Sequence, residues 1–258
     1  MRILCLHGDN QGETASDLAS LSSKLQHSNA NVSFDFADGP LECSSLSADN
    51  STHCKFSKTR ETQGIREAHE WLAKKLDHDG TYDGVLAYSQ GASLVSSFLV
   101  YRQWYHHELP PPFKFAVFIS GEIPLQVLKD LGVPVSKAAE GVVAQADVQR
   151  DRGLGPLLAH ATKARRAVFD SDDCFGLNLN RIPLELKIRI PTVHVWGDKD
   201  PLFPTSVHLA GLCDPYIRKI HVHSGAHEIP REEKDSTELA SLIEWCMQRA
   251  TWPGQTQL

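Results

Sequence analysis

A serine at the junction of an apolar run and a helical pattern is the first feature of this sequence that could do chemistry. Residues 82–88 form the apolar run, and Ser89 follows it in the pattern Ala87-Tyr88-Ser89-Gln90-Gly91. A strand that turns into a helix within about two residues places a serine hydroxyl at the apex, with strained dihedral angles and small neighbours beneath it. The pattern therefore predicts a nucleophile elbow, with Ala87 in place of the usual first glycine. The alternative is a serine that caps an ordinary helix.

A serine hydroxyl needs a neighbouring imidazole base to attack a carbonyl at neutral pH, and the imidazole needs a carboxylate to fix its tautomer. In α/β-hydrolase sheets both partners follow the serine in chain order, each on a loop after a late strand. The stretch Gly197-Asp198-Lys199-Asp200-Pro201 meets this requirement for the acid. We predict that Asp200 is the acid, because Pro201 extends its backbone and directs the loop toward the sheet, and that Asp198 is a turn residue.

The predicted base is His227, which follows Gly225 in a loop where a small residue lets the chain bend over the serine. A surface histidine is the alternative interpretation. His221 and His223 share one face of a strand and could suggest a metal site with His227, but zinc catalysis would need a clear third ligand and would leave the elbow unexplained. We therefore predict no metal and no cofactor, and a structural role for His7.

The oxyanion that develops during such a reaction needs at least two preorganised N–H donors. The backbone N–H of Gln90 is one candidate, because it directly follows the nucleophile at the start of a helix. The second is expected from the loop after the first strand, at Asp9 or, as the lesser candidate, Asn10. The carboxylate of Asp9 would oppose the oxyanion charge unless it is turned away or protonated. The alternative role for Asp9 is to cap the following helix.

Alternating strand and helix patterns supply the frame for these residues. The sequence predicts an α/β-hydrolase fold with a mostly parallel, doubly wound sheet, in a single domain over residues 1–258. A helical insertion over 122–190, broken by prolines, is expected to cap the carboxyl edge of the sheet, where ligands bind in open α/β folds. The predicted strands are 2–6, 32–36, 82–88, 113–119, 192–196 and 216–222, the predicted helices are 14–25, 64–76, 90–104, 206–212 and 231–249, and 41–60 is a long loop.

Composition narrows the class of protein. The net charge of −6 at pH 7 gives no electrostatic reason to expect nucleic acid or an anionic membrane surface as a partner. No apolar run reaches the roughly 20 residues that a membrane helix needs. The six cysteines include no C-x-x-C pair, which argues against a zinc site and favours a reducing compartment. Residues 1–8 are too short an apolar segment for a secretory signal, so we expect a cytoplasmic protein.

Six short motifs occur in the chain in the order Leu6-His7-Gly8, Phe36-Ala37-Asp38-Gly39-Pro40, Tyr88-Ser89-Gln90-Gly91, Phe118-Ile119-Ser120-Gly121, Gly197-Asp198-Lys199-Asp200-Pro201 and Gly225-Ala226-His227-Glu228-Ile229-Pro230. Together they resemble the FSH family of serine hydrolases. The resemblance implies Ser89 as nucleophile, Asp200 as acid and His227 as base, together with the oxyanion donors given above. Ala87, Asp9 and the length of the 122–190 region depart from the family pattern, and the last two affect the substrate more than the reaction type.

The predicted function is therefore that of an esterase or thioesterase, acting on a small-molecule acyl ester or thioester. Several fungal members that look similar in having a cap act in polyketide pathways, so the resemblance implies an acyl carrier protein domain as a partner. Acyl transfer to an alcohol or amine through the same residues is one alternative, and a non-catalytic ligand-binding protein is another. The cap residues Phe169, Phe175, Leu177, Leu179 and Ile182 are expected to pack the cap onto the sheet, or else to line an acyl pocket.

Overall fold

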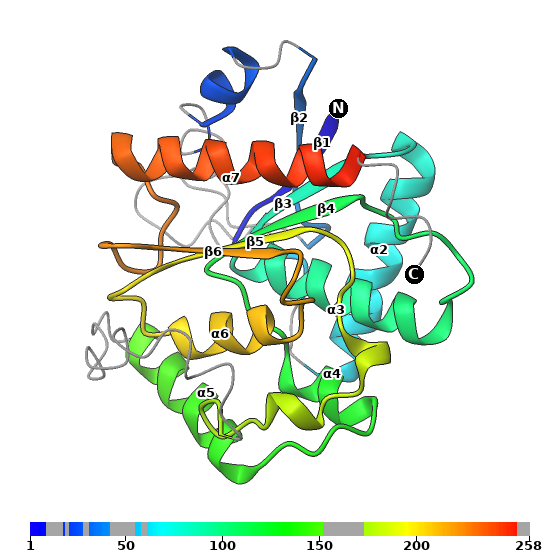
Figure 1. Cartoon of the computed structure of the whole chain (residues 1–258). Coiled ribbons are helices and arrows are strands. Elements are labelled where there is room, and N and C mark those ends of the chain that lie inside the picture. The colour runs from blue at the N-terminus through cyan, green and yellow to red at the C-terminus, as the bar shows by residue number, and fades with distance from the viewer. Residues whose placement is uncertain are drawn as a thin grey trace.

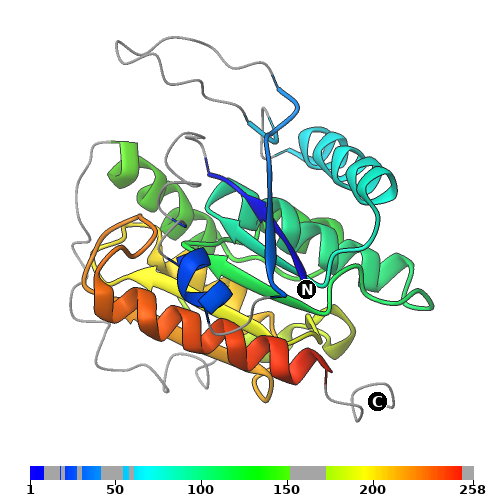
Figure 2. The ribbon, with the colours of Figure 1, turned by 90° about the horizontal axis from the view of Figure 1, so that it is seen from above.

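Six parallel strands form one sheet in the order β2-β1-β3-β4-β5-β6 (Figure 1). The computed structural model describes residues 1–8, 18, 21–27, 31–41, 55–57, 61–151 and 173–251. β1 and β2 lie side by side at one edge, and β3 continues the sheet on the other side of β1 (Figure 2). The strands are β1 (Arg2–Leu6), β2 (Ser33–Ala37), β3 (Gly84–Tyr88), β4 (Phe115–Ile119), β5 (Thr192–Gly197) and β6 (Arg218–His223).

The strand order reverses at β1, and this reversal decides where a ligand can bind. The chain runs from β1 outward to β2 and then returns to place β3 on the opposite side of β1. In open α/β sheets, the crevice at such a switch point, outside the carboxyl ends of the strands, is the usual binding site. The loop after β1 and the predicted elbow after β3 meet at this crevice.

The central strands are apolar on both faces because helices cover the sheet from both sides. Every residue of β4 is buried, as is every residue of β5. Near-continuous apolar runs of this kind are typical of parallel sheets that are buried on both faces. Successive side chains alternate between two cores: Val85 and Ala87 belong to one, whereas Leu86 belongs to the other.

Helices α2 (Thr62–Asp79), α3 (Gln90–Tyr105) and α6 (Phe203–Gly211) cover one face of the sheet, and α7 (Glu233–Thr251) lies on the opposite face (Figure 1). The core between the sheet and α7 includes Leu239 and Ile243 of α7. It also includes Leu21 and Leu25, which lie in the helical segment 21–27. The doubly wound arrangement predicted from the sequence is therefore present. The remaining residues of the predicted helix 14–25, apart from 18, lie outside the described residues.

The described part of the region 122–190, which the sequence analysis predicted to be an insertion, packs against α3 and α6. It contains α4 (Leu125–Asp130), α5 (Lys137–Asp151) and the short 3-10 helices η2 (Leu179–Arg181) and η3 (Leu184–Leu186). α5 contacts α6, and η3 contacts α3. Proline residues precede α4 and η3, as the breaks in the helical pattern predicted.

Apolar side chains attach the insertion to the main core. Leu177, Leu179 and Ile182 are buried in the core on the α3 face, and Phe175 packs edge-on against Phe203 at 5.4 Å between ring centroids. These residues pack the insertion onto the sheet domain. Phe169 lies outside the described residues.

Most element boundaries differ by one to three residues from those predicted, and two of the differences have clear local reasons. α6 begins at Phe203 instead of 206, because Pro204 stands in its first turn, where the missing proline N–H costs nothing. β6 begins at Arg218 instead of 216, because Asp214 closes a turn in which it accepts hydrogen bonds from the backbone N–H groups of Tyr216 and Ile217. Of the predicted loop 41–60, the described residues include a bridge between Leu41 and Lys55.

No helix among the described residues is both long enough and apolar enough to cross a membrane.

Replacing Gly84 with Ala should destabilise the protein, whereas the same change at Gly141 should not. A Cβ atom at Gly84 would lie 2.2 Å from Cζ of the buried Phe115 ring, so the ring would have to move within a packed core. We expect the free energy of unfolding to fall by about 1–3 kcal/mol. Gly141 lies within α5 with open space around it, so Gly141→Ala should leave stability unchanged or raise it by up to about 1 kcal/mol. Urea denaturation measures the free energy of unfolding of both variants. Equal effects would contradict the close packing of Gly84 against Phe115.

Acid should weaken the fold through His194. Its ring is buried on β5, next to Phe118, and burial lowers the pKa of His194 to about 3. In the unfolded chain the His194 imidazole becomes protonated below about pH 6.5, whereas in the folded chain it stays neutral down to about pH 3. The free energy of unfolding therefore falls as the pH drops from 6.5 toward 3, by roughly 2 kcal/mol at pH 5. The His194→Gln variant should therefore lose less stability than the wild type between pH 7 and pH 5 in urea titrations. Parallel losses would show that His194 does not contribute.

Candidate active site

Ser89 stands at a sharp turn between β3 and α3. Its φ of 50° and ψ of −111° lie in a region that L-residues rarely adopt, which is the strain expected of a nucleophile elbow. The turn is fastened on two sides: the N–H of Ser89 donates to the carbonyl of Ile119 at 3.0 Å, and the N–H of Gly91 donates to the carbonyl of His7 at 3.1 Å. A Cβ atom at Gly91 would lie 2.8 Å from the His7 carbonyl oxygen, which explains the glycine.

The structure brings Ser89, His227 and Asp200 into one chain of hydrogen bonds. Nε2 of His227 lies 2.9 Å from Oγ of Ser89, and Nδ1 of the same ring lies 3.0 Å from Oδ2 of Asp200. A carboxylate accepts hydrogen bonds, so it holds the proton of the imidazole on Nδ1. Nε2 then presents its lone pair to the serine hydroxyl. This is the geometry that general-base activation of a serine requires.

Of the two candidate carboxylates, Asp200 is the one that contacts His227. It is fully buried, and its Oδ1 accepts a hydrogen bond from the N–H of Leu202 at 2.8 Å. Asp198 instead uses its backbone N–H, which donates to the carbonyl of His223 at 2.8 Å. Its side-chain Oδ1 is buried and has no hydrogen-bond partner in the described part of the chain. Asp198 lies in a turn, and its predicted role as an acceptor of backbone hydrogen bonds stays a prediction.

The loops that carry Asp200 and His227 are held together by their backbones. β5 and β6 remain paired up to Gly197 and His223, and beyond them the N–H of Lys199 donates to the carbonyl of Gly225 at 3.0 Å. A Cβ atom at Gly197 would lie 2.2 Å from that same carbonyl oxygen. Only glycine allows the two loops to approach this closely. The approach sets the separation between the acid and the base.

The three-histidine metal site considered from the sequence has no support in the contacts of His221 and His223. Nε2 of His221 lies 2.9 Å from Oδ1 of Asp235 in the first turn of α7. Nδ1 of His223 accepts the N–H of Gly225 at 3.1 Å, and burial lowers the pKa of His223. Across the described ranges, no group of three or more His, Cys, Asp or Glu residues is arranged to hold a metal ion.

The described cysteines are poor nucleophiles. Cys5, Cys174, Cys213 and Cys246 are free and buried. Burial raises the pKa of Cys174 and Cys213 to about 12, and it also raises the pKa of the Cys5 and Cys246 thiols. Because the thiolate is the reactive form, these groups are inert at neutral pH.

The side chain of Gln90 is engaged elsewhere, which leaves its backbone for the predicted oxyanion role. Its Oε1 accepts the N–H of Phe56 at 2.8 Å, and its Nε2 donates to the carbonyl of Ser57 at 3.4 Å. Gln90 is the first residue of α3, so its N–H has no acceptor within the helix. Sequence reasoning did not find the contact with residues 56 and 57, because nothing local to Gln90 indicates it.

The loop after β1 reaches the elbow at Gly8, whose Cβ atom, if present, would lie 3.1 Å from Cβ of Ser89. The predicted second donors, Asp9 and Asn10, lie outside the described residues. His7 is buried and stacks on Phe56 at 4.5 Å between ring centroids, and its Nε2 accepts the N–H of Gly39 at 3.0 Å. These contacts agree with the structural role predicted for His7.

Tyr88 is a residue of the site that the sequence analysis did not identify. Its hydroxyl donates to the backbone carbonyl of His227 at 2.9 Å, and the two rings lie 5.6 Å apart between centroids. The alternation of side chains along β3 could have predicted this contact. It places Tyr88 with Leu86 on the face of the sheet that α7 covers, where Ile229 is also buried. The loop that carries His227 packs on that face.

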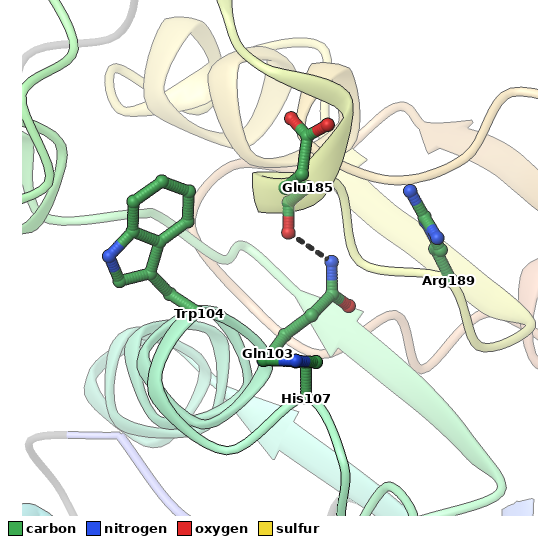
Figure 3. A pocket seen from close by; sticks show the side chains of 5 residues that line it. All are labelled: Gln103, Trp104, His107, Glu185 and Arg189. Carbon is green, nitrogen blue, oxygen red and sulfur yellow. Dashed lines mark hydrogen bonds between the residues drawn. The ribbon is translucent and has the colours of Figure 1, made fainter.

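A depression of about 400 Å³ lies at the other end of α3, lined by Gln103, Trp104, His107, Glu185 and Arg189 (Figure 3). Gln103 joins α3 to η3 there by donating to the carbonyl of Glu185 at 2.6 Å. At 1.5 Å per residue, α3 separates this depression from Ser89 by about 20 Å. None of its lining residues belongs to the Ser89 hydrogen-bond chain, so it is not the candidate active site.

Known proteins similar to this chain are hydrolases and esterases. A family model described as "Serine hydrolase (FSH1)" matches residues 1–239. "Esterase alnB" from Emericella nidulans is 26% identical over 284 residues, which cover 96% of this chain and 97% of the relative. "Esterase FPY3" from Fusarium mangiferae is 26% identical over 258 residues, which cover 97% of this chain and 98% of the relative.

Solved structures support the fold. The crystal structure of the Paleococcus ferrophilus monoacylglycerol lipase superposes with a TM-score of 0.53 at 16% identity, covering 96% of this chain and 94% of the lipase. At this identity the likeness concerns the fold alone. The α/β-hydrolase fold predicted from the sequence is confirmed.

Replacing Gly197 with Ala should slow the reaction of Ser89 with a fluorophosphonate probe. The added methyl group would push the carbonyls of Gly225 and Ala226, which lie 2.2 and 2.3 Å from its position, and would displace His227 with them. A shift of about 1 Å in a catalytic group costs about 100-fold in rate. Labelling rates on a gel measure the effect, with Gly141→Ala as the matched control. A variant that is folded and labelled at the wild-type rate would contradict the argument.

Proposed function

This chain belongs to the FSH1 family of serine hydrolases, and we propose that it hydrolyses acyl esters or thioesters with Ser89 as nucleophile, His227 as base and Asp200 as acid. The observation that carries this proposal is the continuous hydrogen-bond chain from Oγ of Ser89 through the imidazole to the buried carboxylate of Asp200. The family and the names of its relatives make the protein a serine esterase. The residue roles and the thioester substrate are our proposal.

In the acylation half of the proposed reaction, Ser89 Oγ attacks the carbonyl carbon of the substrate while Nε2 of His227 takes the hydroxyl proton. The oxyanion that forms is stabilised by the backbone N–H of Gln90, aided by the N-terminal end of α3. Asp200 stabilises the positive imidazolium through Nδ1. Collapse of the intermediate expels the alcohol or thiol, which receives its proton from Nε2.

In the second half, a water molecule replaces the leaving group. Nε2 of His227 removes a proton from the water, whose oxygen attacks the acyl carbon, and the bond from that carbon to Ser89 Oγ breaks. The proton then returns from Nε2 to Oγ, and the carboxylic acid leaves. His227 therefore acts as base and acid in turn in both halves, which requires its ring to stay in one position.

The substrate class follows from the resemblance of the motifs more than from the geometry. We extend the proposal to thioesters, including an acyl chain on a carrier protein, because a thioester carbonyl undergoes the same attack by Ser89. The 122–190 insertion is proposed to act as the cap that contributes to the acyl site. Intact-mass analysis of the protein with a panel of acyl esters and acyl thioesters would reveal which of them form an adduct on Ser89.

Ser89→Ala should abolish the reaction without loss of the fold. Removing the nucleophile of a serine hydrolase typically lowers kcat by a factor on the order of 10⁴ or more. Hydrolysis of p-nitrophenyl butyrate and labelling by a fluorophosphonate probe measure the loss. Ser93→Ala is the matched control, because it removes a hydroxyl one helical turn further along α3, where Ser93 donates to Glu122 at 2.8 Å. If Ser89→Ala retains the wild-type rate, Ser89 is not the nucleophile.

A further inference from the structure

Tyr88 joins three parts of the candidate site. It lies at the end of β3 directly before Ser89, and its hydroxyl donates to the backbone carbonyl of His227 at 2.9 Å. A Cβ atom at Gly8 would lie 2.9 Å from the Tyr88 ring, so the loop after β1 rests against the same side chain. One residue of the nucleophile strand therefore contacts both the loop of the predicted base and the loop of the predicted oxyanion donor.

Other hydrogen bonds that join the described residues of the His227 loop to a neighbouring segment run to the acid loop. His223 and Gly225 accept backbone hydrogen bonds from Asp198 and Lys199, and Nδ1 of His227 meets Asp200. These contacts fix His227 relative to Asp200. They do not fix the distance between His227 and Ser89. The Tyr88 hydroxyl and the bond between Nε2 of His227 and Oγ of Ser89 make that connection.

The two connections differ during the reaction. Once Oγ of Ser89 is bonded to an acyl group, it has no proton to donate, and its hydrogen bond to Nε2 is lost. The bond from Tyr88 to the His227 carbonyl involves no reacting atom and persists. Of the hydrogen bonds that position His227, those involving Tyr88 and Asp200 then remain.

We propose that Tyr88 is a positioning residue that holds His227 in place for hydrolysis of the acyl-enzyme. In this step Nε2 takes a proton from water, the water oxygen bonds to the acyl carbon, the bond from that carbon to Ser89 Oγ breaks, and the proton passes from Nε2 to Oγ. The inference rests on the proposed function. It assigns to the Tyr88 hydroxyl a larger effect on deacylation than on acylation.

The test is Tyr88→Phe, which removes the hydroxyl and keeps the ring that packs against Gly8. Stopped-flow burst kinetics with p-nitrophenyl butyrate separate acylation from deacylation, and intact-mass spectra give the fraction of acyl-enzyme at steady state. Losing one hydrogen bond should slow deacylation about five- to ten-fold and acylation by less than about twofold. The acyl-enzyme fraction should therefore rise.

Tyr82→Phe is the matched control. The Tyr82 hydroxyl also makes one hydrogen bond, to Oδ2 of Asp79 at 3.0 Å, but it lies just before the start of β3, about 20 Å from Tyr88 at the rise of an extended strand. Its removal should leave the ratio of the two rates unchanged. Thermal unfolding of both variants reports any general loss of stability.

Two results would overturn the inference: equal slowing of both steps in Tyr88→Phe, as a general loosening of the site would produce, or unchanged rates for both. Ser89→Ala separates this failure from failure of the proposed function. If Ser89→Ala is inactive while Tyr88→Phe behaves as the wild type, the reaction stands and the role of Tyr88 is wrong. If Ser89→Ala remains active, the proposed function itself fails.

Discussion

The parallel pairing of β5 with β6 is the constraint on which the rest of the candidate site depends. The two strands stay in register up to Gly197 and His223, and the loops that leave them continue to bond to each other. Because parallel strands end at the same edge, the carboxylate of Asp200 and the imidazole of His227 leave the sheet side by side. Because Gly197 has no side chain, the loop after β5 can lie close to the loop after β6. A fully buried carboxylate is tolerable there because it meets the imidazole and a backbone N–H.

The strained turn at Ser89 is supported from neighbouring strands as well as by its own helix, where the N–H of Ser93 donates to the carbonyl of Ser89 at 3.1 Å. The N–H of Ser89 donates to Ile119 at the end of β4, and the N–H of Gly91 donates to His7, directly after β1. Backbone strain of this kind costs about 1–3 kcal/mol and persists only where surrounding contacts over-determine the conformation. The elbow therefore belongs to the sheet as a whole. It is held at the strand-order switch point, where the loops after β1 and β3 converge.

Several polar side chains around the candidate site form hydrogen bonds that connect separate segments of the chain. Gln90 gives its side chain to residues 56 and 57, and Tyr88 gives its hydroxyl to the backbone of His227. His221 pairs with Asp235 and so links β6 to the start of α7. In the first two cases, a residue next to Ser89 holds a neighbouring loop in place. The reacting atoms are thereby positioned by groups that do not take part in the chemistry.

The sequence alone determined the fold class and the order of the elements, because apolar runs, helical periodicity and turn residues are local signals. It also predicted Ser89, Asp200 and His227 as the catalytic residues, since a nucleophile elbow and two loops after late strands are recognisable from residue types and spacing. Boundaries moved by a few residues where a proline or an Asx turn decided the start, as at α6 and β6.

Only the tertiary structure decided which of two plausible carboxylates meets the imidazole, and what holds each loop. Asp198 and Asp200 both fit the local pattern, and their different roles follow from the path of a loop that is bonded to another loop more than 20 residues away. The contact of Tyr88 with His227 spans 139 positions in the chain. Such contacts depend on the register of parallel strands and on side-chain direction, and neither is set by the residues next to them in sequence.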